Sequence, residues 1–141
     1  MINREMIEGK FDIIERNLKF LTEFKNREVD EFLNSYRDIQ AVKYSLLETI
    51  EACIDIANHI ISVKGYRRAE EYSEMFTILA EEGLIDADLS SNLADMASFR
   101  NLLVHRYGEV NNERVLEIIK SDLGDIREFE KCIERFLRDG A

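Results

Sequence analysis

One short segment of the sequence, SFRNLLVHRYGEV at 98–110, gathers side chains that could act together on a phosphate group. It contains Arg100, Asn101, His105 and Tyr107. A guanidinium fork matches phosphate oxygens, and an amide can orient a hydroxyl or a phosphate. An imidazole can move a proton near neutral pH. These residue types together suit the cleavage of a phosphodiester.

RNA is the natural substrate for this chemistry, because its 2′-hydroxyl is a built-in nucleophile and no metal ion is required. His105 would accept the proton of that hydroxyl or protonate the leaving oxygen, while Arg100 would stabilise charge on the phosphorus. The products would be a cyclic phosphate and a 5′-hydroxyl. A plainer interpretation also fits: an Arg and a His at a helix C-terminus favour the helix dipole and can pair with acids such as Glu109.

The four side chains must be positioned by one helix if they are to act together. At ~100° per residue, Asn101 and His105 fall within about 40° of each other, and Arg100 and Tyr107 within about 20°. We therefore expect them on one broad face, presented to a groove between two helices or two subunits. The other histidine, His59, follows Asp55 by four residues and is expected to form an ordinary pair on a helix surface.

Apolar residues return at helical spacing throughout the chain, proline is absent, and no segment alternates as a strand does. The predicted helices run from 2 to 24, from about 32 to Gly65, from about 70 to 82, from Asp86 or Asp88 to about Tyr107, and from after Asn112 to Asp139. The sequence therefore predicts a single all-α domain over residues 1–141. Its architecture is a helical bundle of about five helices with one long central helix.

Composition limits the possible functions. Of the 141 residues, 45% are hydrophobic and 34% are charged, as expected for a globular domain. The net charge of -10 disfavours nonspecific binding of nucleic acid or anionic membrane over the whole surface, so any phosphate site must be local. Cys53 and Cys132 lie in apolar helical patterns and are predicted to be buried free thiols.

Targeting and metal motifs are missing from the sequence. The N-terminus lacks the pattern of a signal peptide, and no apolar stretch is long enough to span a membrane, so a cytoplasmic protein is predicted. We find no glycine-rich phosphate loop and no Cys and His cluster with metal spacing. Accordingly, neither a metal nor a cofactor is expected.

The motif R-N-x3-H-x-Y, from Arg100 to Tyr107, resembles the signature of HEPN domains of the HepT type. These domains are helical toxin components of toxin–antitoxin pairs. The resemblance covers nearly the whole chain, because the motif and the segments that precede it occur in the family's order and spacing. The segments are LLETIEACIDIANHIIS, EYSEMFTILAEEGLI and LADMASFRNLLVHRYGEV, followed by a last amphipathic helix.

The resemblance implies a metal-independent ribonuclease in which Arg100 and His105 are catalytic and Asn101 supports them. It implies a homodimer whose two motifs face each other across a cleft. Tyr107 matches the tyrosine that an MNT-type nucleotidyltransferase antitoxin modifies with AMP to silence the toxin. An adenylyl group there would oppose RNA binding by its charge and its volume.

Basic residues near the motif suggest how an acidic protein could hold RNA. Lys64, Arg67, Arg68 and Arg106 could collect with Arg100 near the dimer cleft while acids cover the outside. Alternatively, the basic run after the long helix is simply a solvated loop.

Two other functions are compatible with the same residues. The first is a noncatalytic helical module that binds a nucleotide or a partner, which the acidic net charge favours. The second is a helical oligomerisation domain in which the motif is structural. The joint presence of Arg100, Asn101, His105 and Tyr107 favours the ribonuclease, because a binding surface needs no group for proton transfer.

Overall fold

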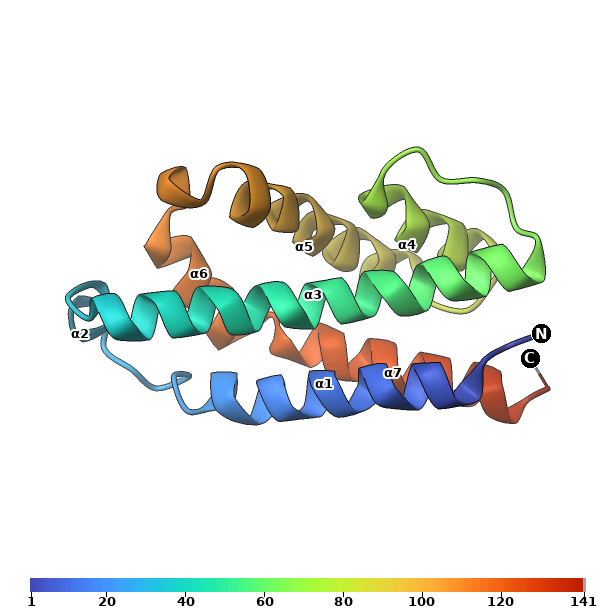
Figure 1. Ribbon diagram of the computed structural model, residues 1–141, viewed down its shortest axis with the longest axis horizontal. Coiled ribbons are helices and arrows are strands. Elements are labelled where there is room, and N and C mark those ends of the chain that lie inside the picture. Colours follow the sequence, from blue (N-terminus) through green and yellow to red (C-terminus); the bar gives the residue numbers. More distant parts are fainter. Residues whose placement is uncertain (141) are drawn as a thin grey trace.

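The computed structural model describes residues 1–140, and this part of the chain is all-helical (Figure 1). Ala141, the last residue of the predicted domain, lies outside the described residues. The described chain forms α1 (Arg4–Thr22), α2 (Val29–Leu33), α3 (Tyr36–Lys64), α4 (Tyr72–Glu81), α5 (Ala87–His105), a 3-10 turn (Tyr107–Glu109), α6 (Asn112–Ser121) and α7 (Leu123–Arg138). The prediction of an all-α bundle with one long helix is confirmed.

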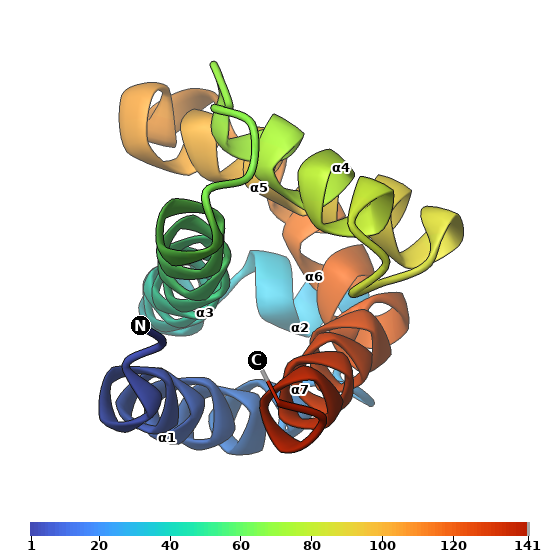
Figure 2. The ribbon, with the colours of Figure 1, turned by 90° about the vertical axis from the view of Figure 1, so that its right-hand side faces the viewer.

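Helix α3 runs along the length of the molecule between two layers (Figures 1 and 2). Helices α1 and α7 lie on one side of it, and α4 and α5 pack together on the other side. Helices α2 and α6 contact each other at the end where α3 begins. The motif helix α5 is therefore supported by α3 along one side and by α4 along another.

The described chain has seven α-helices where about five were predicted, because two of the predicted helices are each divided. Ser35 has an extended backbone, and its Oγ accepts a hydrogen bond from the Asp38 N–H at 3.2 Å, so it caps α3 and separates α2 from it. The last predicted helix is interrupted at Asp122, which stands between α6 and α7. In both cases a short polar side chain lies at the break.

Other helix ends follow the sequence signals closely. Gly65 has a φ of 68° and ends α3 in the left-handed conformation that glycine favours. Asp86, one of the two predicted caps, accepts a hydrogen bond from the Leu89 N–H at 2.8 Å and begins α5. These ends fix where the motif helix starts and where the loop before α4 begins.

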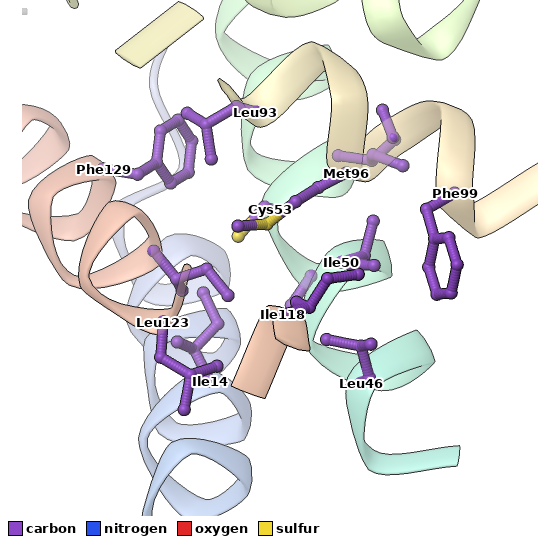
Figure 3. Packing of buried hydrophobic residues seen from close by; sticks show 14 of the residues in the cluster. Ile14, Leu46, Ile50, Cys53, Leu93, Met96, Phe99, Ile118, Leu123 and Phe129 are labelled. Atoms are coloured by element: carbon purple, nitrogen blue, oxygen red, sulfur yellow. The ribbon is translucent and has the colours of Figure 1, made fainter. Parts of the chain in front are cut away.

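A single hydrophobic core fills the space around α3 (Figure 3). Ile50 and Cys53 of α3 pack in the same cluster as Met96 of α5 and Phe129 of α7. Cys53 is buried and unbonded, and so is Cys132, as predicted. Within residues 1–140, no helix is long and apolar enough to cross a membrane.

Polar contacts fix how α1 lies against α3. The Ser45 hydroxyl donates to Asn17 Oδ1 at 2.6 Å in a buried contact between the two helices. Lys10 binds Asp55 at 2.8 Å. The predicted pair of Asp55 and His59 is wrong, because Asp55 bonds to α1 and His59 Nε2 accepts the Asn3 N–H at 2.9 Å.

One carboxyl group is buried at the packing of α7 against α1. Glu130 is only 5% exposed. Burial raises the pKa of Glu130 to about 8, and its hydrogen bond and charge repulsion with Glu15 act in the same direction. The folded state therefore favours the protonated carboxyl, whereas the unfolded chain ionises at a normal pKa of about 4.3. The stability that Glu130 contributes is complete below that normal pKa and is lost as the pH rises through about 8.

We predict that Glu130→Gln makes the free energy of unfolding less dependent on pH. Relative to wild type, the variant should gain at least about 1 kcal/mol between about pH 5 and about pH 9, because the amide stays neutral. Urea unfolding at both pH values measures this, with the exposed Glu128→Gln as the control. An unchanged difference between wild type and Glu130→Gln across this range would contradict the raised pKa.

Candidate functional site

Three motif residues, Arg100, Asn101 and His105, line one surface groove of about 580 Å³ between α5 and the start of α4. They come from the second half of α5, whose opposite face is buried in the core through residues such as Phe99 and Leu103. Burial of that face turns the motif residues toward α4. The remaining lining residues are Ala69, Glu70, Glu71, Tyr72 and Met75. We call this hollow the α4–α5 groove.

Arg100 is held by contacts from three elements. Its Nε donates to the Glu51 carboxylate of α3, and its Nη1 donates to Asn101 Oδ1 at 3.1 Å. Its guanidinium carbon lies 4.7 Å from the centre of the Tyr72 ring on α4. Only 14% of the Arg100 side chain is exposed. Nη2 makes no hydrogen bond within residues 1–140, so its two N–H groups are left for a ligand.

His105 is the last residue of α5 and lies one turn beyond Asn101 on the same side of the helix. It is exposed, and within the described part of the chain its ring makes no hydrogen bond or ion pair. Both ring nitrogens are therefore available to a ligand in the groove. A group that is free to take and give a proton suits general acid–base chemistry.

Tyr107 does not share the face of Arg100, so this part of the sequence prediction is wrong. Helix α5 ends at His105, and Arg106 has φ −139° and ψ 44°, which turns the chain before Tyr107. The Tyr107 hydroxyl donates to Gln40 Oε1 of α3 at 2.8 Å. A helical projection fails here because the helix stops two residues before the tyrosine.

Lys43 of α3 secures the same tyrosine. Its ammonium donates to the Tyr107 backbone oxygen at 3.0 Å and lies 3.7 Å from the centre of the ring. Burial lowers the pKa of Lys43. Burial also raises the pKa of the Tyr107 hydroxyl, with a further contribution from Tyr36. The hydroxyl is therefore protonated and hydrogen-bonded beside α3.

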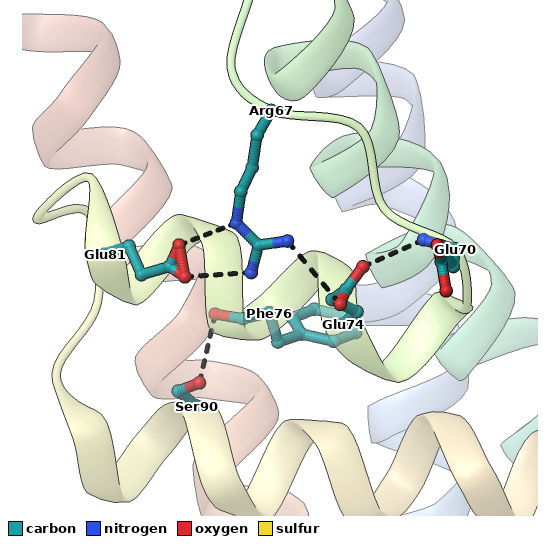
Figure 4. A network of polar contacts seen from close by, with 6 residues as sticks. All are labelled: Arg67, Glu70, Glu74, Phe76, Glu81 and Ser90. Carbon is teal, nitrogen blue, oxygen red and sulfur yellow. Dashed lines mark hydrogen bonds and ion pairs between the residues drawn. The ribbon is translucent and has the colours of Figure 1, made fainter.

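The basic residues that were expected near the motif have other partners. Arg67 binds Glu81 through two hydrogen bonds of 2.8 Å and reaches Glu74 at 3.5 Å (Figure 4). Hydrogen bonding to Glu81 raises the pKa of Arg67. Lys64 lies 5.8 Å from the centre of the Phe136 ring on α7. Neither cation lines the α4–α5 groove.

The last two basic candidates are exposed. Arg106 forms an ion pair with Glu109 at 3.5 Å on the surface. The sequence suggested an ion pair of this kind for Glu109, and the arginine that forms it is Arg106. Arg68 is exposed in the loop between α3 and α4. Of the basic residues that were expected to hold RNA, Arg100 alone lines the α4–α5 groove in the described part of a single chain.

Sequence reasoning missed four residues that contact the motif: Glu51, Tyr72, Gln40 and Lys43. Glu51 and Lys43 occur in an amphipathic pattern where they look like ordinary surface residues of a helix. Only the packing of α3 against α5 brings them to the motif. Within residues 1–140, no group of three or more His, Cys, Asp or Glu side chains is placed to hold a metal ion.

Comparison with known proteins gives consistent matches. The family model described as Ribonuclease HepT-like matches residues 14–133. A relative from Shewanella oneidensis, described as an mRNA nuclease HepT, is 32% identical over 130 residues, which cover 92% of this chain and 97% of the relative. A tRNA nuclease HepT of Aphanizomenon flos-aquae is 29% identical over 133 residues, covering 94% of this chain and 90% of the relative.

A solved structure shows the same fold. It contains the tri-AMPylated Shewanella oneidensis HEPN toxin in complex with MNT antitoxin, and it superposes on this chain with a TM-score of 0.85 at 31% identity. The match covers 95% of this chain and 99% of that one.

The contacts of the motif predict different effects on stability for its two ionisable residues. His105→Ala should change the free energy of unfolding by no more than about 0.5 kcal/mol, because the ring is exposed and unbonded. Arg100→Ala should cost about 1 kcal/mol or more, because it leaves the half-buried Glu51 carboxylate without its partner. Urea unfolding measures both, with the exposed Arg106→Ala as the control for removal of an arginine. A large loss from His105→Ala would mean that this histidine is structural.

Proposed function

Because the chain belongs to the HepT-like HEPN ribonuclease family, we propose that it is the toxin of a HEPN/MNT toxin–antitoxin pair and cleaves RNA in the α4–α5 groove without a metal ion. The observation that carries this proposal is the position of Arg100, Asn101 and His105 in one groove. Relatives described as mRNA and tRNA nucleases support RNA as the substrate.

In the proposed reaction the 2′-oxygen of the RNA attacks the adjacent phosphorus, and the bond from phosphorus to the 5′-oxygen breaks. His105 accepts the proton of the 2′-hydroxyl or donates one to the leaving 5′-oxygen. The free Nη2 of Arg100 stabilises the charge on the phosphoryl oxygens, and Asn101 orients the guanidinium. The products are a 2′,3′-cyclic phosphate and a 5′-hydroxyl.

A homodimer fits this reaction better than a single chain. Each chain supplies one His105, whereas cyclisation uses both a base and an acid, so two motifs that face each other would supply the pair. Leu102 and Val104 are each 43% exposed beside the motif. Burying these apolar side chains between two copies would favour pairing at this end of α5.

The proposed regulation acts on Tyr107. An MNT-type nucleotidyltransferase partner attaches AMP to this hydroxyl, as the tri-AMPylated relative in complex with MNT antitoxin suggests. The hydroxyl donates to Gln40, and this hydrogen bond is lost when AMP replaces the hydroxyl proton. The added phosphate lies two residues from His105 in sequence and opposes RNA phosphates near the groove.

We predict that the unmodified protein cleaves a mixed RNA pool in EDTA and that His105→Ala lowers the rate by about 100-fold or more, since positioned acid–base groups contribute this much. The products should carry cyclic phosphates. His59→Ala is the matched control, because His59 bonds to the Asn3 backbone and lies outside the groove. It should retain the wild-type rate.

Intact mass must show that the protein tested carries no adenylyl group, and both variants must be folded at the assay temperature. Absence of cleavage by such a wild-type sample would overturn the ribonuclease proposal and favour the noncatalytic binding module. Equal losses in His105→Ala and His59→Ala would argue against a role of the groove.

The site of modification is tested by co-expression with an MNT-type nucleotidyltransferase. Wild type and Tyr36→Phe should gain the mass of one or more adenylyl groups, whereas Tyr107→Phe should gain none. Tyr36 is a stringent control, because it is 76% exposed and contacts the same glutamine as Tyr107. Adenylylation of Tyr107→Phe, or none of the wild type, would contradict the proposal.

A further inference from the structure

Tyr72 is an aromatic side chain in the α4–α5 groove that neither the motif nor the proposed reaction uses. It is the first residue of α4 and is 40% exposed, whereas Phe76, one turn later, is buried at 1% exposure. The ring therefore remains at the edge of the core and opens onto the groove that it lines with Arg100 and His105. An exposed ring beside a phosphate-binding group is typical of surfaces that hold single-stranded nucleic acid.

The charges along the groove distinguish two ends. Arg100 supplies the positive charge on the α5 side, and its guanidinium is 4.7 Å from the Tyr72 ring. Glu70 and Glu71 line the groove on the other side, just before Tyr72 in the sequence. Carboxylates repel a phosphodiester, so an RNA phosphate belongs at Arg100, and an uncharged part of the RNA belongs beside the ring.

The loop that carries these groups is anchored. The Glu70 backbone N–H donates to Glu74 Oε1 at 2.8 Å, and Arg67 reaches the same Glu74 side chain (Figure 4). Arg67 also binds Glu81, so the loop is tied to both halves of α4. The ring is therefore presented at a fixed place next to Arg100, which lowers the entropy cost of binding a base against it.

We propose that Tyr72 is the stacking surface for one nucleobase next to the scissile phosphate, so the groove takes single-stranded RNA with an unstacked base. This inference rests on the proposed ribonuclease function and adds the form of its substrate. A base within an RNA duplex is stacked on its neighbours and is unavailable to the ring. Single-stranded loops and ends are accordingly the preferred substrates.

The experiment must separate stacking from a second role of Tyr72, which is to hold the Arg100 guanidinium. Binding is measured with the His105→Ala protein, so that the RNA stays intact, by fluorescence anisotropy of a short single-stranded RNA. A matched series carries one abasic nucleotide at successive positions. Tyr72→Ala removes the ring, Tyr72→Phe keeps it, and Thr77→Ala is an exposed control on the same helix outside the groove.

We expect Tyr72→Ala to weaken binding of the intact RNA by roughly 5- to 150-fold, the range found for loss of one stacked base. Tyr72→Phe should stay within about threefold of the Tyr72 protein, since stacking needs the ring and not the hydroxyl. One abasic position should weaken binding to the Tyr72 protein by a similar factor. With that abasic RNA, Tyr72→Ala should have an effect of about twofold or less, because the stacked base is already absent.

Other results would distinguish failure of the stacking inference from failure of the proposed ribonuclease function. If Tyr72→Ala weakens binding of intact and abasic RNA equally, the ring acts through Arg100 and the stacking inference is overturned. If Tyr72→Ala behaves like Thr77→Ala while wild type cleaves RNA in EDTA, the inference is also overturned and the ribonuclease function stands. If wild type does not cleave and the His105→Ala protein does not bind the RNA, the proposed function fails and the inference fails with it.

Discussion

Burial of α3 on most of its surface is the constraint on which the other helices depend. The middle of this helix packs against both layers of the bundle, so its few polar side chains are partly shielded from solvent. They therefore need hydrogen-bond or ion-pair partners within the protein. Thr49 bonds to the Ser45 carbonyl within α3, whereas several other polar side chains have partners in other elements. The contacts are Asn17 with Ser45 and Glu48, Lys10 with Asp55, Arg100 with Glu51, and the Tyr107 backbone with Lys43. Packing and polar pairing therefore set the places of α1 and α5 together.

Arg100 belongs both to this framework and to the groove. Its contact with Glu51 offsets the cost of half-burying the two charges, and the same contact orients the guanidinium so that Nη2 remains free. In the proposed reaction this means that the phosphate-binding group is fixed before RNA arrives, which is the arrangement that favours electrostatic stabilisation of a transition state. His105 has no such framework role, so chemistry and stability can be separated at that position.

The end of α5 at His105 divides the motif into two parts with different surroundings. Arg100, Asn101 and His105 lie in the groove, whereas Tyr107 lies on the following turn and is held by Gln40 and Lys43 of α3. Under the proposed regulation, AMP would be added close in sequence to the proposed catalytic residues without any change in the helix that positions them. In this proposal, the modification would block access and add negative charge while the bundle stays intact.

The sequence by itself determined the all-α architecture, the end of α3 at Gly65, the cap at Asp86 and the buried cysteines, because periodicity and capping are local properties of the chain. It also identified the motif on α5. The breaks at Ser35 and Asp122 also lie at local polar side chains, although the apolar periodicity continues across them. Only the tertiary structure decided that Tyr107 turns toward α3. It also decided that Glu51 and Tyr72 contact Arg100. These features depend on which faces of distant helices meet, and no local pattern specifies that.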